Sequence, residues 1–134
     1  MYCGTDIIEV ERIKEAIKNT KGFKENIYTK NEIEDIDNIK SDLKYQRYAG
    51  RFAAKEAIYK AMSKILIENN LNMSFLDVEI LNVKELSRRP RVIFLKQEII
   101  ELIEKENIAI DISISHIETA AIANAIVTKG GKNE

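Results

Sequence analysis

The sequence predicts an α+β domain in which a mainly antiparallel sheet of hairpins packs against helices gathered on one face. Three observations support this class. A strand-like segment opens the chain, a long stretch with helical apolar spacing occupies its middle, and two pairs of alternating segments follow. The 134 residues suffice for one core. We therefore expect a single domain over residues 1–128 and a flexible tail over residues 129–134.

Composition excludes several classes of function. Twenty-one basic and 22 acidic residues nearly cancel, so no general basic field indicates nucleic-acid binding. A single cysteine allows neither an internal disulfide nor a cysteine-based metal site, and a single histidine argues against a zinc site. No apolar run reaches membrane-spanning length, and the first residues lack the pattern of a signal peptide. We expect a cytoplasmic protein without a membrane segment.

The first predicted element is a strand over Met1–Ile8. Gly4 marks a point in it where another backbone or a ligand comes close. Asp6, near the strand's end among apolar and small residues, is either a cap for the next helix or a ligand. For an isolated aspartate the cap is the commoner role.

Two helices are expected next. Val10–Asn19 carries an amphipathic stripe and is broken at residues 20–22. From the sequence alone, its basic residues are best explained as the solvent-exposed face of the helix. Thr29 and Glu32 fit a capping box, which predicts a helix from Thr29 to about Ile39 with Glu32 as the capping partner.

The longest helix should begin at Ser41 or Asp42 and run to about Glu68. Its apolar arc consists mostly of small side chains, so another element can approach it closely. The arc comprises Ala53, Ala54, Ala57, Ile58, Ala61 and Ile65. Gly50 lies inside this helix, where it either costs about 1 kcal/mol relative to alanine or permits a close approach.

The opposite side of this helix carries Glu56, Lys60 and Ser63. A glutamate four residues before a lysine is the favourable order for an ordinary exposed pair, worth about 0.2–0.5 kcal/mol. Taken alone, the stretch is best explained in this way. The rest of the chain offers a second interpretation.

The C-terminal half predicts two hairpins separated by a helix. Its elements are a strand over Leu76–Lys84, a turn over Arg88–Pro90, a strand over Arg91–Leu95, a helix over Lys96–Asn107, a strand over Ile108–Ser115, a connection containing His116, and a last strand over Ala120–Val127.

The polar residues near element ends could form a site. Two carboxylates, Asp6 and Glu56, suit Mg²⁺, which takes one or two carboxylates and lets phosphates and waters complete its shell. Lys60 could meet a phosphate as a point charge. His116 could donate to a phosphate, or it could be a turn or core histidine. The chain has no P-loop, dinucleotide glycine pattern or nucleophile elbow.

Several blocks, in order along the chain, together resemble the holo-[acyl-carrier-protein] synthases, the short bacterial 4′-phosphopantetheinyl transferases. The most specific is residues 49–57, Ala-Gly-Arg-Phe-Ala-Ala-Lys-Glu-Ala. The others are Gly-Thr-Asp-Ile at 4–7, Glu-Arg-Ile at 11–13, Lys-Ala at 60–61, and Ile-Ser-His at 114–116 before an alanine-rich strand. The resemblance covers nearly the full length.

This resemblance implies Mg²⁺-dependent transfer of phosphopantetheine from coenzyme A to a serine of an apo acyl carrier protein, with release of adenosine 3′,5′-bisphosphate. Fatty-acid synthesis or a specialised pathway could be served. The family is a homotrimer with active sites between subunits.

The resemblance also implies roles for residues. Asp6 and Glu56 would bind Mg²⁺ and, with Lys60, form the catalytic set. The coenzyme A site would be formed by Lys60, His116, Arg51 and Ser63, with His116 at the nucleotide end. A neighbouring subunit could supply His116. Arg12, Lys18 and Phe52 would face the carrier protein.

Two positions depart from the family pattern. The family usually has a glycine-rich turn after Lys60-Ala61, whereas this chain continues Met-Ser-Lys-Ile-Leu, so we expect the helix to continue. Arg89 stands where the family usually has glycine before the hairpin proline. The altered stretch sustains one alternative, a non-catalytic trimeric protein that binds carrier proteins and has an impaired coenzyme A site.

Overall fold

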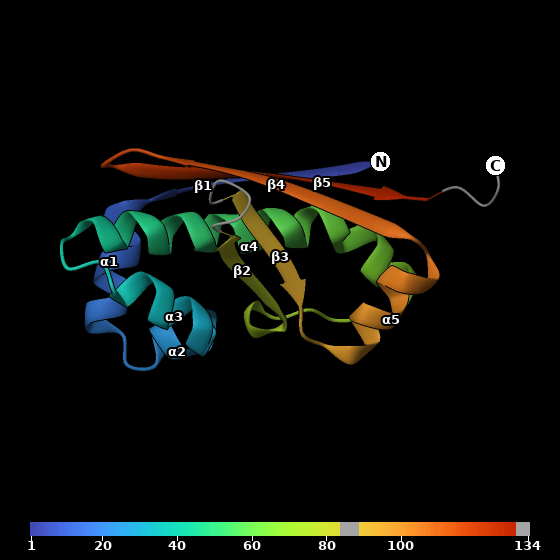
Figure 1. Cartoon of the computed structure of the whole chain (residues 1–134), viewed down its shortest axis with the longest axis horizontal. Coiled ribbons are helices and arrows are strands. Elements are labelled where there is room, and N and C mark those ends of the chain that lie inside the picture. Colours follow the sequence, from blue (N-terminus) through green and yellow to red (C-terminus); the bar gives the residue numbers. More distant parts are fainter. Residues whose placement is uncertain (84–88, 131–134) are drawn as a thin grey trace.

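Helix α4 (Leu43–Glu68) runs the length of the molecule, and every other layer packs on it (Figure 1). The structure is a computed structural model that describes residues 1–83 and 89–130. The remaining helices are α1 (Val10–Asn19), α2 (Phe23–Ile27), α3 (Lys30–Asp37), the 3₁₀ turn η1 (Phe75–Asp77) and α5 (Gln97–Lys105). The strands are β1 (Tyr2–Glu9), β2 (Val78–Val83), β3 (Arg89–Phe94), β4 (Ile108–His116) and β5 (Ala120–Lys129).

The α+β class and the antiparallel pairing are confirmed, but the hairpins belong to two sheets. One sheet has the order β1-β5-β4, and β2-β3 forms a second, two-stranded sheet. Strand β1 pairs antiparallel with β5 on the side opposite β4, with Gly4 opposite Ala125 and Asp6 opposite Ala123. The β2-β3 hairpin instead crosses the side of α4 (Figure 1).

The contact between α4 and the three-stranded sheet is built from small residues. The predicted apolar arc of α4 is buried throughout, and alternate residues of β5 face it: Ala121, Ala123, Ala125 and Val127. A Cβ placed on Gly4 would lie 2.1 Å from the carbonyl oxygen of Ala57 and 2.8 Å from the amide nitrogen of Ala61. Backbone therefore meets backbone here, as the glycine predicted.

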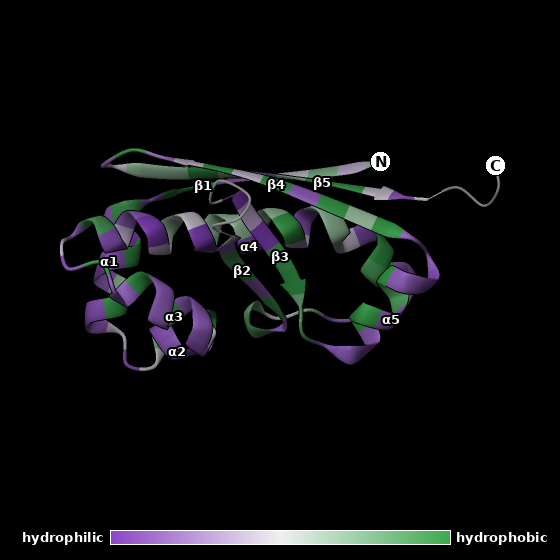
Figure 2. Cartoon of the chain, viewed as in Figure 1, coloured by the Kyte–Doolittle hydropathy of each residue, from purple (hydrophilic) through white to green (hydrophobic). Residues whose placement is uncertain are grey.

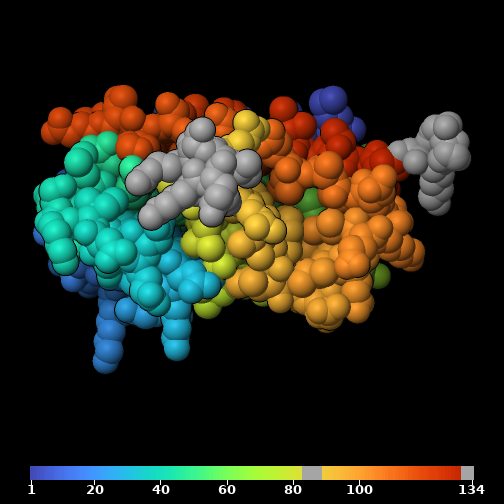
Figure 3. Space-filling view, viewed as in Figure 1, coloured from blue at the N-terminus to red at the C-terminus, as the bar shows by residue number. Residues whose placement is uncertain are grey.

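Helices α1 to α3 cover the first half of α4. Their second apolar cluster includes Ile13, Ile36, Tyr28 and Tyr48, and the Tyr28 hydroxyl donates to the carbonyl of Tyr48 at 2.7 Å. Their outward sides are largely hydrophilic (Figure 2), and the space-filling view shows α3 beside the β2-β3 hairpin (Figure 3). Among the described residues no helix is long and apolar enough to cross a bilayer.

The boundaries mostly follow the sequence pattern. The capping box at Thr29 is confirmed, and α4 continues past Ala61 to Glu68. Three predictions were wrong: Arg89 and Pro90 belong to β3 instead of a turn, His116 ends β4 instead of lying in the connection, and β5 reaches Lys129 instead of ending at Val127.

These differences have simple causes. Pro90 is tolerated because a two-stranded sheet has only edge strands, which can spare an amide hydrogen. Lys129 pairs with Ile108 in the ladder and forms an ion pair with Glu106 at 3.1 Å. The sequence analysis did not predict α2 or η1, because five residues and a single turn are too short to show a helical period. The turn residue Arg88, the strand end Lys84 and the tail residues 131–134 lie outside the described residues.

The Gly4 contact gives a test of stability. Gly4→Ala should destabilise the protein by about 1–3 kcal/mol, because the new methyl group meets rigid backbone. Gly50→Ala is the matched control, since its Cβ would meet only a methyl group of Ile114 at 3.0 Å and alanine favours the helix by about 1 kcal/mol. Urea unfolding of both variants measures the difference, and equal stabilities would contradict the close contact.

Candidate active site

Asp6, Lys60 and Glu56 meet where β1 crosses α4. The Lys60 ammonium donates to the carbonyl of Thr5 at 2.9 Å and to Asp6 Oδ1 at 3.3 Å. Glu56 lies one turn before Lys60 and forms no ion pair with any residue that the structure describes. The ordinary Glu56–Lys60 helix pair is therefore not the contact formed, because β1 draws the ammonium toward Asp6.

The electrostatics of Glu56 reflect this arrangement. Its pKa is raised, first by burial and second by the negative charge of Asp6, while Lys60 opposes the shift. Both carboxylates thus come from one chain and lie close enough to repel each other. In the folded state the charged form of Glu56 is disfavoured.

Two neighbouring carboxylates with incomplete compensation are a donor set that fits Mg²⁺. No group of three or more histidine, cysteine, aspartate or glutamate residues that could hold a metal occurs in residues 1–83 and 89–130. Further oxygen ligands would therefore have to come from water or from a bound phosphate. This is the manner in which Mg²⁺ is usually held beside nucleotide phosphates.

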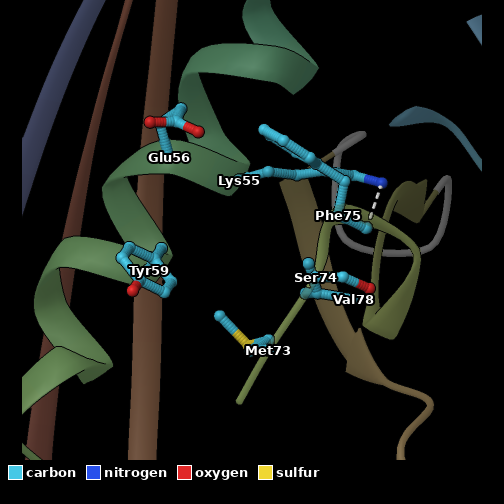
Figure 4. A pocket seen from close by; sticks show the side chains of 7 residues that line it. All are labelled: Lys55, Glu56, Tyr59, Met73, Ser74, Phe75 and Val78. Atoms are coloured by element: carbon cyan, nitrogen blue, oxygen red, sulfur yellow. Dashed lines mark hydrogen bonds between the residues drawn. The ribbon is translucent and has the colours of Figure 1, made fainter. Parts of the chain in front are cut away.

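A pocket of about 390 Å³ opens beside Glu56. Glu56 and Tyr59 of α4 stand on one side, and the segment leading into β2 forms the other (Figure 4). The lining on that side is Met73, Ser74, Phe75 and Val78. The pocket thus has a largely apolar wall on one side and the Glu56 carboxylate at the edge of the other.

His116 lies in a different pocket of about 210 Å³, which it shares with Arg47, Gly50, Arg51 and Asn82 among others. Its Nδ1 lies 2.8 Å from the side-chain oxygen of Gln46. Burial, and then the charge of Arg47, lowers the His116 pKa, so the ring is neutral at pH 7. Gln46 and Glu56 are ten residues apart on α4, which is about 15 Å along a helix. One chain therefore does not bring His116 to the carboxylates.

The other predicted site residues are held in different ways. Arg51 is 3% exposed; it donates from Nε to the carbonyl of Ile80 at 2.8 Å and pairs with Asp35 at 3.0 Å. The Ser63 hydroxyl donates back to the Lys60 carbonyl at 2.9 Å. Arg51 therefore lines its pocket as a largely committed structural group, and the Ser63 donor is already used.

Among the residues expected to face a carrier protein, Phe52 is half-buried and stacks between Phe23 and Phe75, at centroid distances of 6.4 and 5.4 Å. Arg12 and Lys18 are exposed on α1, and the Lys18 ammonium lies 5.6 Å from the ring centroid of Tyr45. Phe52 thus contacts the lining of the pocket beside Glu56 through Phe75, whereas Arg12 and Lys18 lie on a different helix.

Comparison with known proteins identifies the family. The sequence model of the 4′-phosphopantetheinyl transferase superfamily matches residues 2–123. The chain belongs to this superfamily. It is 42% identical over 132 residues to the holo-[acyl-carrier-protein] synthase of Ruminiclostridium cellulolyticum (97% of this chain, 93% of that protein), and 44% identical over 124 residues to that of Fusobacterium nucleatum (92% and 95%). It is a 4′-phosphopantetheinyl transferase of the holo-[acyl-carrier-protein] synthase type.

Solved structures of this family have the same fold. The Bacillus anthracis synthase, in complex with CoA (3′,5′-ADP), superposes with a TM-score of 0.74 at 30% identity, covering 96% of each chain. The Helicobacter pylori synthase in complex with coenzyme A gives 0.72 at 32% identity, covering 94% of this chain and 99% of that one.

Sequence reasoning missed two further residues of the candidate site. Lys55 and Tyr59 both line the pocket beside Glu56. Tyr59 is half exposed and falls on the polar side of the helix, and that position was the available signal. Lys55 gave no signal, because its partner is far away in the sequence.

The carboxylate pair gives a test that does not require activity. Because the folded-state pKa of Glu56 is raised, the folded protein binds the proton more tightly, and unfolding free energy falls as pH rises through that range. Glu56→Gln should therefore raise the thermal midpoint of the metal-free protein at pH 7. It should also abolish the stabilisation that Mg²⁺ gives the unaltered protein.

Thermal unfolding with and without Mg²⁺ measures both effects. Glu68→Gln, an exposed carboxylate at the far end of the same helix, is the matched control and should change neither. A Glu56→Gln protein that keeps the full Mg²⁺ shift would remove Glu56 from the metal site.

Proposed function

We propose that the protein transfers the 4′-phosphopantetheine group of coenzyme A to a serine hydroxyl of an apo acyl carrier protein, in a Mg²⁺-dependent reaction that releases adenosine 3′,5′-bisphosphate. The observation that carries the proposal is the Asp6–Glu56 pair with Lys60 beside an open pocket. Two related synthases bind coenzyme A or its nucleotide. The cytoplasm is the expected compartment.

The chain's residues would mainly position groups and neutralise charge, which is what phosphoryl transfer requires. Asp6 and Glu56 would hold Mg²⁺, and the bound ion would supply positive charge beside the pyrophosphate. The serine oxygen forms the new bond to phosphorus as the pyrophosphate bond breaks, and Lys60 would offset the charge that develops on the leaving phosphate. The serine proton would pass to Glu56 or to a nearby water.

The pocket of His116 would take the nucleotide end of coenzyme A. Arg47, which has no ion pair among the described residues, faces this pocket and lowers the pKa of His116 by its like charge. A phosphate bound there would relieve that repulsion. Arg12 and Lys18 on α1 would meet the acidic carrier protein, with Phe52 as an apolar contact.

We also propose a homotrimer. The outer face of the β1-β5-β4 sheet exposes Ile7, Ile122 and Ile126, a concentration of apolar side chains that a second copy could cover. Since Gln46, which contacts His116, lies about 15 Å along α4 from Glu56, a neighbouring subunit would supply His116 to each site.

One observation favours the alternative, a non-catalytic trimeric carrier-binding protein with an impaired coenzyme A site. Helix α4 continues unbroken to Glu68, so the backbone amides after Ala61 are engaged within the helix. Phosphate binding in this stretch would depend on side chains alone, chiefly Lys60.

Mass spectrometry of an apo carrier protein incubated with coenzyme A and Mg²⁺ tests the reaction. We expect a gain of one phosphopantetheinyl group that a chelator abolishes. Lys60→Ala should lower kcat/KM for coenzyme A by about 10²-fold or more, because a preorganised charge is lost. Absence of transfer to several carrier proteins, together with retained carrier binding, would favour the alternative.

A mixing experiment tests the shared site. Glu56→Gln and His116→Ala proteins should each be inactive alone. After dissociation and random reassembly in equal amounts, about a quarter of the sites would combine an intact Glu56 with an intact His116 from the neighbour, so activity should return to about that level. Persistent inactivity would contradict sites shared between subunits.

A further inference from the structure

Lys55 is a buried charge that the proposed reaction does not use. It is 2% exposed, and its ammonium forms an ion pair with Glu32 at 2.7 Å. It also donates to the carbonyl of Ile27 at 2.8 Å and to the carbonyl of Phe75 at 2.9 Å, the contact drawn in Figure 4. All three donors of the ammonium are therefore occupied.

Glu32 extends this contact to two more segments. One carboxylate oxygen accepts from Lys55 and from the backbone amide of Thr29, and the other accepts from the backbone amide of Ile80 at 2.8 Å. The pair thus joins α4 to the end of α2, the start of α3, the turn η1 and strand β2. No other ion pair in the described part of the chain is buried on both sides.

Stability alone is a poor explanation for such a pair. Desolvation of two charges offsets most of their attraction, and well-packed apolar replacements are often neutral or stabilising. What the pair does provide is geometry, because each of its hydrogen bonds to a third residue fixes a backbone atom. One of those atoms, the carbonyl oxygen of Phe75, belongs to the wall that faces Glu56 across the pocket (Figure 4).

The pocket suits the arm of a coenzyme A donor. The pantetheine arm alternates methylene groups with amides. The wall offers the apolar side chains Met73, Phe75 and Val78. The Tyr59 hydroxyl can donate and accept, and the Ser74 hydroxyl, whose hydrogen goes to Asp77, can accept. A ligand of this kind needs a wall held at a fixed distance from the reacting centre.

We propose that Lys55 is a positioning residue, which through Glu32 and Phe75 holds the 73–78 wall opposite Glu56 and thereby sets the affinity for the pantetheine arm. This inference rests on the proposed function. It assigns Lys55 no contact with the reacting atoms. It distinguishes Lys55 from its neighbour Glu56, which faces the site itself.

Two ligands separate this role from a general structural one. Coenzyme A has the arm, whereas adenosine 3′,5′-bisphosphate has only the nucleotide end. Lys55→Met should raise the Kd for coenzyme A by about tenfold or more and leave the Kd for adenosine 3′,5′-bisphosphate within about twofold. The KM for coenzyme A should rise with that Kd, and kcat at saturation should change by less than about threefold.

Calorimetric titration of both ligands measures the effect, with Lys24→Met as the matched control. Lys24 also forms an ion pair with a carboxylate, that of Asp37 at 2.7 Å, but it does not line the pocket. An equal loss of affinity for both ligands, or no loss for either, would overturn the positioning role.

A second variant protects the test against misfolding. Asp77 accepts from the backbone amide and hydroxyl of Ser74 at 2.8 and 3.1 Å, and these bonds cap the turn η1 near the surface. Asp77→Ala should loosen the same wall and raise the Kd for coenzyme A by about threefold or more, again without changing the Kd for the bisphosphate. Unchanged coenzyme A affinity in this variant would also contradict the proposal.

The proposed function can fail separately. If the unaltered protein binds coenzyme A but transfers nothing, the reaction is excluded while the ligand comparison still decides the role of Lys55. If it does not bind coenzyme A at all, both proposals are wrong.

Discussion

The rest of the structure depends on the backbone contact between Gly4 and α4. It is possible only because position 4 has no side chain and because alanines occupy positions 57 and 61. In a strand, residues two apart face the same way and lie about 6.5 Å apart, so Asp6 must also face α4, near Lys60 and Glu56. The spacing of the carboxylates is thus set by the absence of a methyl group two residues earlier. Any residue larger than glycine would lift the strand and move Asp6 with it.

Helix α4 then divides its surface among three tasks. Its alanine side receives the sheet, and the side that carries Arg51 and Lys55 receives the hairpin and α3. There the carbonyl of Ile80 accepts from Arg51 and its amide donates to Glu32, so side chains satisfy the edge of β2 where a further strand is missing. What remains is the edge with Glu56 and Lys60, left open between the layers.

Local patterns explain which parts were predictable. Some signals involve only residues close together in the sequence, such as the alternation of a strand, the period of a helix and the Glu56–Lys60 spacing. Helix α4, the two carboxylates and Lys60 could therefore be expected from the sequence. The division into two sheets could not, since strand alternation does not reveal which strands pair. Nor could the pairing of Lys55 with Glu32, 23 residues away, which burial imposes. Arg51 was expected at a ligand for the same reason, because its partner Ile80 lies 29 residues away in the chain.

Lys55 and Glu56 are neighbours in sequence with opposite electrostatic situations. The charge of Lys55 is buried and fully bonded, and no buried side-chain nitrogen or oxygen in the described part of the chain lacks a partner. The charge of Glu56 is repelled by Asp6 and only partly offset by Lys60. A satisfied charge resists movement, and an unsatisfied one attracts a cation. Consecutive positions on one helix therefore carry one charge that is held in place by its hydrogen bonds and one that is left to bind a cation.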